Sequence, residues 1–176
     1  MGMLTVRVDA RRVLEKNVFT VLWSGGVDST AALLWVMDNV SHDNWNVLYV
    51  EVTGNTHPMC TRYVVETARR LGILNKLVVA ARRDIEFFDC LVKYGVPVIR
   101  YNRWCLHRFK LPLFLRYAHR VHVLGVRKEE SKPRSTIYSH VVLSTRESRL
   151  LVCPIFDWRR EHVLKLSLIH ISEPTR

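Results

Sequence analysis

The sequence predicts an α/β fold in which a parallel sheet carries helices on both faces. Short apolar runs at residues 18–23, 47–52, 77–81 and 121–126 alternate with longer amphipathic segments. Strands that alternate with helices in this way form parallel βαβ units. The chain of 176 residues, 48% of them hydrophobic, is large enough for the core of one such domain.

The first predicted strand and helix enclose a loop that contains two glycines. Residues 18–23 are rich in β-branched and aromatic residues and too few for a helix. The next segment is an amphipathic helix, because its apolar residues recur at i, i+3, i+4 and i+7: Leu33, Val36, Met37 and Val40. The loop between them reads SGGVDST, residues 24–30. Since the first N–H groups of a helix have no partner within it and the helix dipole favours an anion, we expect this loop to bind a phosphate group.

Three further helical segments follow. The segment after Pro58 has one apolar face and is expected to end at Gly72. Residues 85–94 are expected to form a helix that ends at Gly95. The last of the three is predicted to place four residues on one face, namely Leu111, Phe114, Leu115 and Ala118.

Composition and charge limit the classes of protein that fit. No run of eighteen apolar residues occurs, and residues 1–17 are too polar for a signal peptide, so we expect a cytoplasmic protein without a membrane span. The 4 cysteines form no CxxC, which disfavours a zinc ribbon and suits a reducing compartment. The net charge of +11 makes nucleic acid a candidate partner, although no nucleic-acid reader motif is present.

Later segments extend the pattern that begins with SGGVDST, which is neither a Walker loop nor a GxGxxG fingerprint. In order they read TGNTHP at 53–58, RWC at 103–105 with a lysine at 110, GVRKEESKPR at 125–134, and PIFDW at 154–158. In order and spacing they resemble the motifs of the phosphoadenosine phosphosulfate (PAPS) reductase family: SGGxDS, TGN-x-x-P, RWC-x4-K, GxRxxES-x-x-R and PI-x-DW. The resemblance covers residues 18–165 and implies a Rossmann-like, adenine nucleotide α-hydrolase-like domain.

The resemblance also implies roles for these residues. The phosphates of PAPS, adenylylsulfate (APS) or ATP would be held by Ser24, Gly25, Gly26, Val27, Asp28, Ser29 and Thr30. The nucleoside would face Thr53, Gly54 and Asn55. A sulfate or phosphate would be bound by Gly125, Arg127 and Lys128, and the catalytic candidates are Asp28, Arg127 and Arg134. Further candidates are Arg103, Cys105, Lys110 and Ser131.

The sequence leaves open the roles of several of these side chains. Asp28 could cap the helix, which we favour, or help to hold Mg²⁺. Cys105 could be a nucleophile or a cluster ligand, but without a CxxC we expect no iron–sulfur cluster. We expect His57 to be exposed, and His119 and His122 not to form a metal site.

Three functions fit the resemblance. The first is a PAPS or APS reductase of sulfur metabolism, which would need a C-terminal cysteine and a thioredoxin-like reductant. The second is an ATP pyrophosphatase that adenylates an acceptor in sulfur transfer or nucleic-acid modification. The complete SGGVDST loop and the charge of +11 favour this second function. The third is a nucleotide-binding subunit without turnover, similar to the small subunit of a sulfate adenylyltransferase.

The loops and the end of the chain give two further expectations. Because ligands of parallel sheets bind beyond the carboxyl ends of strands, the loops after residues 23, 52 and 124 should line one edge. Residues 141–144 and 150–153 are predicted to form a hairpin. Residues 166–176 look like the translation of a sequencing adaptor, so we expect a domain over residues 1–165 that is truncated at its C-terminus, followed by a non-native tail.

Overall fold

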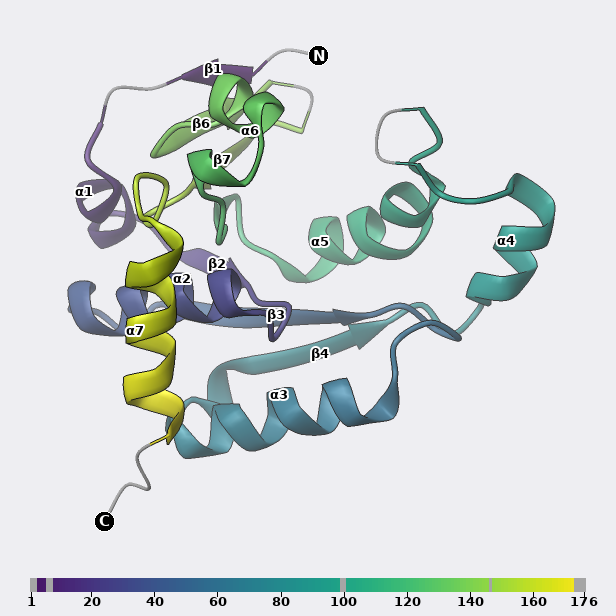
Figure 1. Ribbon diagram of the computed structural model, residues 1–176, viewed down its shortest axis with the longest axis horizontal. Coiled ribbons are helices and arrows are strands. Elements are labelled where there is room, and N and C mark those ends of the chain that lie inside the picture. The colour runs from purple at the N-terminus through teal and green to yellow at the C-terminus, as the bar shows by residue number, and fades with distance from the viewer. Residues whose placement is uncertain (1–2, 6–7, 99–100, 146, 173–176) are drawn as a thin grey trace. The chain divides into compact units, whose positions relative to one another are not determined.

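The structure is a computed structural model that describes residues 3–5, 8–98, 101–145 and 147–172 (Figure 1). The chain forms two compact units. The first unit contains Met1–Val47 and His119–Arg176, and the second contains Leu48–Ala118. Strands and helices alternate along the chain, and the strand pairs around β5 are parallel, which confirms the predicted α/β class.

The sheet of the first unit has a parallel centre and an antiparallel edge. Its strand order is β1-β6-β7-β5-β2, followed by β3, which runs on into the second unit. The bounds are β1 Met3–Thr5, β2 Phe19–Leu22, β3 Trp45–Glu51, β5 Val121–Val123, β6 Val141–Ser144 and β7 Arg149–Val152. β5 pairs in parallel with β2 and β7, whereas β6 is antiparallel to both β7 and β1. The predicted hairpin is therefore confirmed as β6 and β7.

The centre of this sheet is buried on both faces. Three consecutive residues of β2, Phe19–Val21, are buried, and so are all three residues of β5. Such a run without an exposed alternate residue is typical of parallel strands that are covered on both sides. Trp23, which directly follows β2, is 2% exposed and belongs to the core next to the SGGVDST loop.

The helices of the first unit are α1 (Ala10–Glu15), α2 (Val27–Asn39), η3 (Lys128–Glu130), α6 (Lys132–Ile137) and α7 (Arg160–Ser172). α2 buries Leu33 and Val36 as predicted, although it ends before Val40. α7 packs against α2 (Figure 1). The sequence did not predict β1, α1 or α6, because elements of three to six residues are too short to show a periodic pattern.

The second unit contains the end of β3, its neighbour β4 (Leu77–Ala81) and four helical segments. These are α3 (Pro58–Arg70), the 3-10 turn η1 (Leu74–Lys76), α4 (Phe87–Tyr94) and α5 (Leu111–Tyr117), and a π-helical turn η2 (Leu106–Lys110) precedes α5. The predicted stops are confirmed, because Gly72 and Gly95 have φ of +70° and +71°, a conformation that favours glycine.

One predicted helical face in the second unit is wrong. Leu113 is the buried residue of α5, whereas Leu115 is 52% exposed and Ala118 follows the helix. The π-helical turn explains the difference, because its wider winding rotates the residues that follow it relative to a regular helix. The turn places Phe109 in a hydrophobic cluster with Trp104 and Cys90. No helix in the described ranges combines the length and apolar character that a membrane span requires.

Candidate functional site

The SGGVDST loop, residues 24–30, is a tight turn from β2 into α2. Gly25 has φ of +78°, a left-handed conformation in which a side chain would be strained. Ser24 N donates to Ser29 Oγ at 3.2 Å, and the two serine hydroxyls lie 3.0 Å apart. Ser29 Oγ in turn donates to Gly26 O at 2.9 Å. These bonds close the turn with the loop's own residues.

The base of this turn is anchored in the core. Thr30 Oγ1 donates to Gly26 O at 3.0 Å and accepts from Trp23 Nε1 at 2.9 Å. Both Thr30 and Trp23 are nearly fully buried. The hydroxyl of Thr30 therefore links the turn at Gly26 to the buried side chain of Trp23.

The start of α2 is suited to an anion. Gly26 is the N-cap residue, and no side chain caps this end of the helix. The first backbone hydrogen bond of the helix runs from Thr30 N to Gly26 O at 2.9 Å. The N–H groups of Val27, Asp28 and Ser29 come before this bond, at the end of the helix where N–H groups have no α-helical acceptor. Backbone donors at a helix N-terminus, together with the helix dipole, form a site for phosphate.

Asp28 does not cap α2, so the role that we favoured from the sequence is wrong. Its carboxylate accepts from Arg127, with Nε 2.7 Å from Oδ1 and Nη2 3.4 Å from Oδ2. Both oxygens thus face a guanidinium. Within the described ranges, no group of three or more His, Cys, Asp and Glu side chains is arranged to hold a metal ion.

Arg127 is held between two carboxylates. Besides its contacts with Asp28, its Nη1 donates to Glu129 Oε2 at 3.1 Å. The side chain is only 9% exposed, and the hydrogen bond that it donates to Asp28 raises the pKa of the guanidinium. Arg127 N also donates to Glu130 Oε2 at 3.2 Å, and Glu130 forms an ion pair with Arg134. Arg127 and Arg134, the two arginines predicted to be catalytic, therefore have carboxylate partners in this structure.

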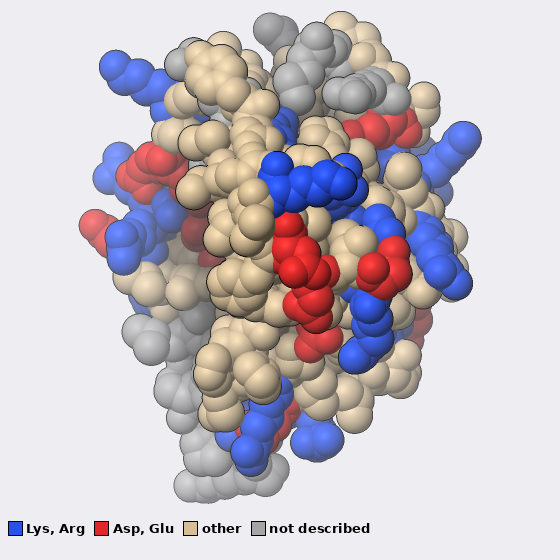
Figure 2. All heavy atoms as spheres, turned by 90° about the vertical axis from the view of Figure 1, so that its right-hand side faces the viewer, with Lys and Arg blue, Asp and Glu red and all other residues tan. Residues whose placement is uncertain are grey.

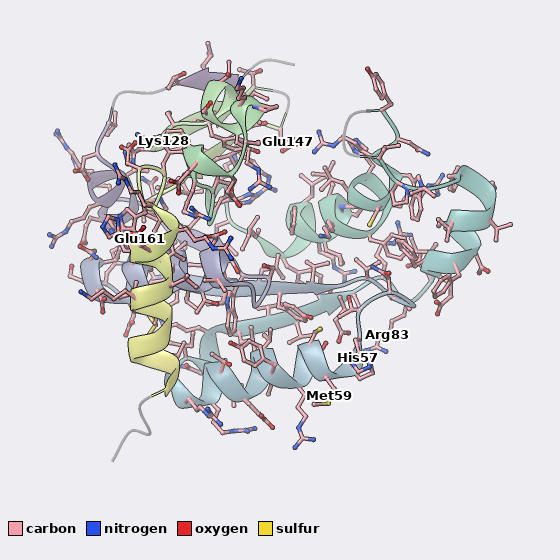
Figure 3. The ribbon with its side chains drawn as sticks, in the orientation of Figure 1. His57, Met59, Arg83, Lys128, Glu147 and Glu161 are labelled. Atoms are coloured by element: carbon pink, nitrogen blue, oxygen red, sulfur yellow. The ribbon has the colours of Figure 1, made fainter. Side chains whose placement is uncertain are left out.

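Lys128 is linked to the PIFDW segment. Its Nζ lies 2.6 Å from Asp157 Oδ1, and its N donates to Phe156 O at 2.9 Å. His140 Nε2 lies 2.7 Å from the other oxygen of Asp157. The hydrogen bonds from Lys128 and His140 lower the pKa of Asp157. Figure 3 labels Lys128 together with Glu161 of α7.

Gly125 explains how the GVRKEE segment, residues 125–130, approaches α2. A Cβ built on Gly125 would lie 2.5 Å from Asp28 O and 2.6 Å from Ser29 Cα. Both are backbone atoms of the first turn of α2, so only glycine allows this approach without a shift. The structure therefore brings the SGGVDST loop and the GVRKEE segment together within the first unit.

The TGN residues lie in the second unit. Thr53 Oγ1 donates to Arg82 O at 2.5 Å, and Thr53 O accepts from Phe87 N at 3.0 Å. Gly54 has φ of +82°, and Asn55 N donates to Val52 O at 2.9 Å. These bonds join the loop to the segment that follows β4.

His57 directly precedes α3 in the same unit. It is exposed as predicted, and its Nδ1 also caps the helix by accepting from Met59 N at 3.2 Å (Figure 3).

The RWC segment precedes the π-helical turn in the second unit. Arg103, Cys105 and Lys110 are half-buried. Burial raises the pKa of the Cys105 thiol, while the charge of Lys110 lowers it by a smaller amount. Because the thiolate is the nucleophilic form, this environment does not favour Cys105 as a nucleophile at neutral pH.

The basic side chains of the chain are mixed with acidic ones. On the face drawn in Figure 2, Lys and Arg residues are interspersed with Asp and Glu. The contacts of Arg127, Lys128 and Arg134 show the same mixture at close range. Several of the basic side chains in this chain of net charge +11 are thus paired locally with carboxylates.

Comparison with known protein families identifies the domain. The family model described as phosphoadenosine phosphosulfate reductase domain matches residues 18–171. The chain belongs to this family. The family match and α7 both extend past residue 165. The domain boundary after residue 165 stays a prediction.

Two solved structures have a similar fold. PAPS reductase from Candida auris, in a phosphate complex, aligns with 96% of this chain and 82% of its own length, at 13% identity and a TM-score of 0.60. FMN adenylyltransferase from Candida glabrata, with FAD and inorganic pyrophosphate, aligns with 94% of this chain and 56% of its own length, at 13% identity and a TM-score of 0.54. The comparison with curated proteins gave no match. The PAPS reductase-family chain therefore has the fold of these enzymes.

Proposed function

We propose that this domain binds an adenine nucleotide by its phosphates at the N-terminus of α2. The observation that carries the proposal is the start of that helix, where Gly26 occupies the cap position and the N–H groups of Val27, Asp28 and Ser29 precede the first helical bond. The hydroxyls of Ser24 and Ser29 lie at the same turn. The roles predicted for the TGN residues of the second unit toward the nucleoside stay a prediction.

The charges around this helix end indicate how an anion would be attracted. Arg127 carries one positive charge but contacts the carboxylates of Asp28 and Glu129. Lys128 is likewise paired with Asp157. The net attraction of these two side chains for a phosphate is therefore small, and the helix dipole supplies the positive potential. A role of Asp28 in binding Mg²⁺ would require its carboxylate to leave Arg127.

Reduction of PAPS or APS in sulfur metabolism is the first candidate reaction. The family match and the GVRKEESKPR and PIFDW segments support it. A reductase of this kind would also need a redox thiol and a thioredoxin-like reductant. In this reaction the side chain of Lys128 and the N-terminal end of α2 would orient the nucleotide.

ATP cleavage between the α and β phosphates, with transfer of the adenylyl group to an acceptor, is the second candidate. The complete SGGVDST loop favours it. Such catalysis requires positioning and charge stabilisation more than a protein nucleophile, which is compatible with the raised pKa of Cys105. The acceptor would then be a sulfur carrier or a nucleic acid.

A charge placed at the helix end tests the proposed phosphate site. Val27 is the first residue of α2 and 45% exposed, so Val27→Asp adds a negative charge where the phosphates would lie. An acidic residue in the first turn favours the helix, so the variant should stay folded. We expect affinity for ATP and PAPS in isothermal titration to fall at least about tenfold, because like charges repel at short range.

The matched control is Val27→Asn, which has the same shape without the charge and should bind within about threefold of the unchanged chain. Unchanged affinity of Val27→Asp for both nucleotides would contradict the proposed site. Sulfite release from PAPS with a thiol reductant, measured beside pyrophosphate release from ATP, then decides between the two reactions.

A further inference from the structure

We infer that Glu129 is a positioning residue of the phosphate site, an inference that rests on the proposed function. Glu129 falls at a variable position of the GxRxxES pattern, so the resemblance assigns no role to it. In the structure it acts through Arg127 and through the start of α7.

One oxygen of Glu129 joins two elements of the first unit. Its Oε2 accepts from Arg127 Nη1 at 3.1 Å and from Arg160 N at 3.1 Å. Arg160 is the first residue of α7, so this carboxylate also satisfies a backbone donor at the start of that helix.

The contacts continue from Arg127 to α2. Its guanidinium reaches Asp28 in the first turn of α2 through Nε at 2.7 Å and through Nη2 at 3.4 Å. α2 and α7 pack against each other. Glu129 and Arg127 therefore connect the N-terminal ends of two packed helices, one of which carries the proposed phosphate site.

Glu129 is needed to fix the orientation of Arg127. A guanidinium is planar and has five N–H donors in a fixed fork, so contacts on two of its edges determine where the other donors point. Without Glu129, the contacts described for this guanidinium would be those with Asp28 alone. Arg127, which contacts Asp28 in the first turn of α2, would then be held less firmly.

A role of Glu129 through its charge and a role through the position of Arg127 predict opposite effects on nucleotide affinity, which makes the inference testable. Asp28 and Glu129 together carry two negative charges against the one positive charge of Arg127. If Glu129 acted only through its charge, removing that charge would strengthen the binding of an anion. If Glu129 positions Arg127, shortening the side chain weakens binding even though the charge remains.

The experiment compares Glu129→Gln with Glu129→Asp in the full chain, with ATP and PAPS as probes in isothermal titration. Gln keeps the length and an acceptor oxygen, so we expect affinity within about threefold of the unchanged chain. Asp keeps the charge but is one methylene shorter, so we expect affinity to fall about tenfold, because small displacements in a binding site are costly. Thermal melting of each variant reports whether it is folded.

Glu161→Gln is the matched control. Glu161 lies in the first turn of α7 next to Arg160 and is exposed, and its substitution removes the same charge from the same helix end (Figure 3). We expect its affinity to stay within about twofold, since it has no contact with Arg127 in the described structure.

Three outcomes overturn the inference. They are unchanged binding by Glu129→Asp, a loss in Glu129→Gln as large as that in Glu129→Asp, and tighter binding by both variants. If the unchanged chain binds neither ATP nor PAPS, the proposed function fails and the inference fails with it. If it binds while all variants bind equally, the inference alone fails.

Discussion

Apart from the pair between Asp28 and Arg127, the hydrogen bonds described for the SGGVDST loop join residues at most 7 positions apart, as between Trp23 and Thr30. The GVRKEE segment is instead tied to other elements by partners that are 29, 31 and 99 positions away. The two loops touch each other through Gly125 and Asp28. The first loop is thus shaped by its own residues, and the second by the packing of the unit around it.

This difference predicts where substitutions should act. A change in the SGGVDST loop removes local bonds and should disturb mainly the loop itself. A change in β5 or in the GVRKEE segment removes contacts between elements, so it should lower the stability of the whole unit.

The largest effect is expected from His122 in β5, the strand that leads into the GVRKEE segment. His122 is 3% exposed, and its Nε2 accepts from Arg149 Nη1 of β7 at 3.0 Å. Burial and the charge of Arg149 lower the pKa of His122 from 6.5 to about 4. As pH falls below 6.5 the unfolded chain binds a proton that the folded chain excludes until about pH 4. Stability should therefore be highest above pH 6.5 and fall by about 3 kcal/mol toward pH 4.

Urea unfolding at pH 7.5 and at pH 4.5 measures this loss. The control His122→Asn keeps a polar side chain that can accept from Arg149 but does not titrate, so its stability should change less between the two pH values. Equal losses in the two proteins would show that other groups cause the acid sensitivity.

The second effect concerns the contact between the two loops. In Gly125→Ala the new Cβ would meet Asp28 O at 2.5 Å, and the backbone of α2 or of the GVRKEE segment must move. We expect a loss of about 2 kcal/mol in the free energy of unfolding, typical of overpacking, together with weaker nucleotide binding.

Gly26→Ala is the matched control in the local loop. A Cβ at Gly26 would lie 3.4 Å from Ser24 Oγ, an ordinary contact, so the loss should be smaller, below about 1 kcal/mol. A loss in Gly125→Ala no larger than that in Gly26→Ala would mean that the two loops pack less closely than described.

The smallest effect is expected from Ser29→Ala. Its hydroxyl accepts from Ser24 N and donates to Gly26 O, so the substitution should cost about 1 kcal/mol. Hydrogen exchange should become faster at residues 24–30 but not in β7. Ser135→Ala, which removes one exposed bond on α6, should have almost no effect. Faster exchange throughout the first unit would contradict the local character of the SGGVDST loop.

Local patterns in the sequence predicted much of the fold. The ends of α3 and α4 were predicted because Gly72 and Gly95 adopt left-handed conformations that other residues avoid. The apolar face of α5 was predicted wrongly because the π-helical turn before it changes the winding. β1 and α1 were missed because they are too short to have a period.

The sequence by itself determined the SGGVDST turn, since its glycines and hydroxyls form bonds with residues only a few positions away. Only the tertiary structure decided that Asp28 pairs with Arg127 instead of capping α2, and that Glu129 reaches the start of α7. The physical reason is that 27 Lys and Arg residues and 16 Asp and Glu residues allow many pairings, and only the packing of the elements selects among them.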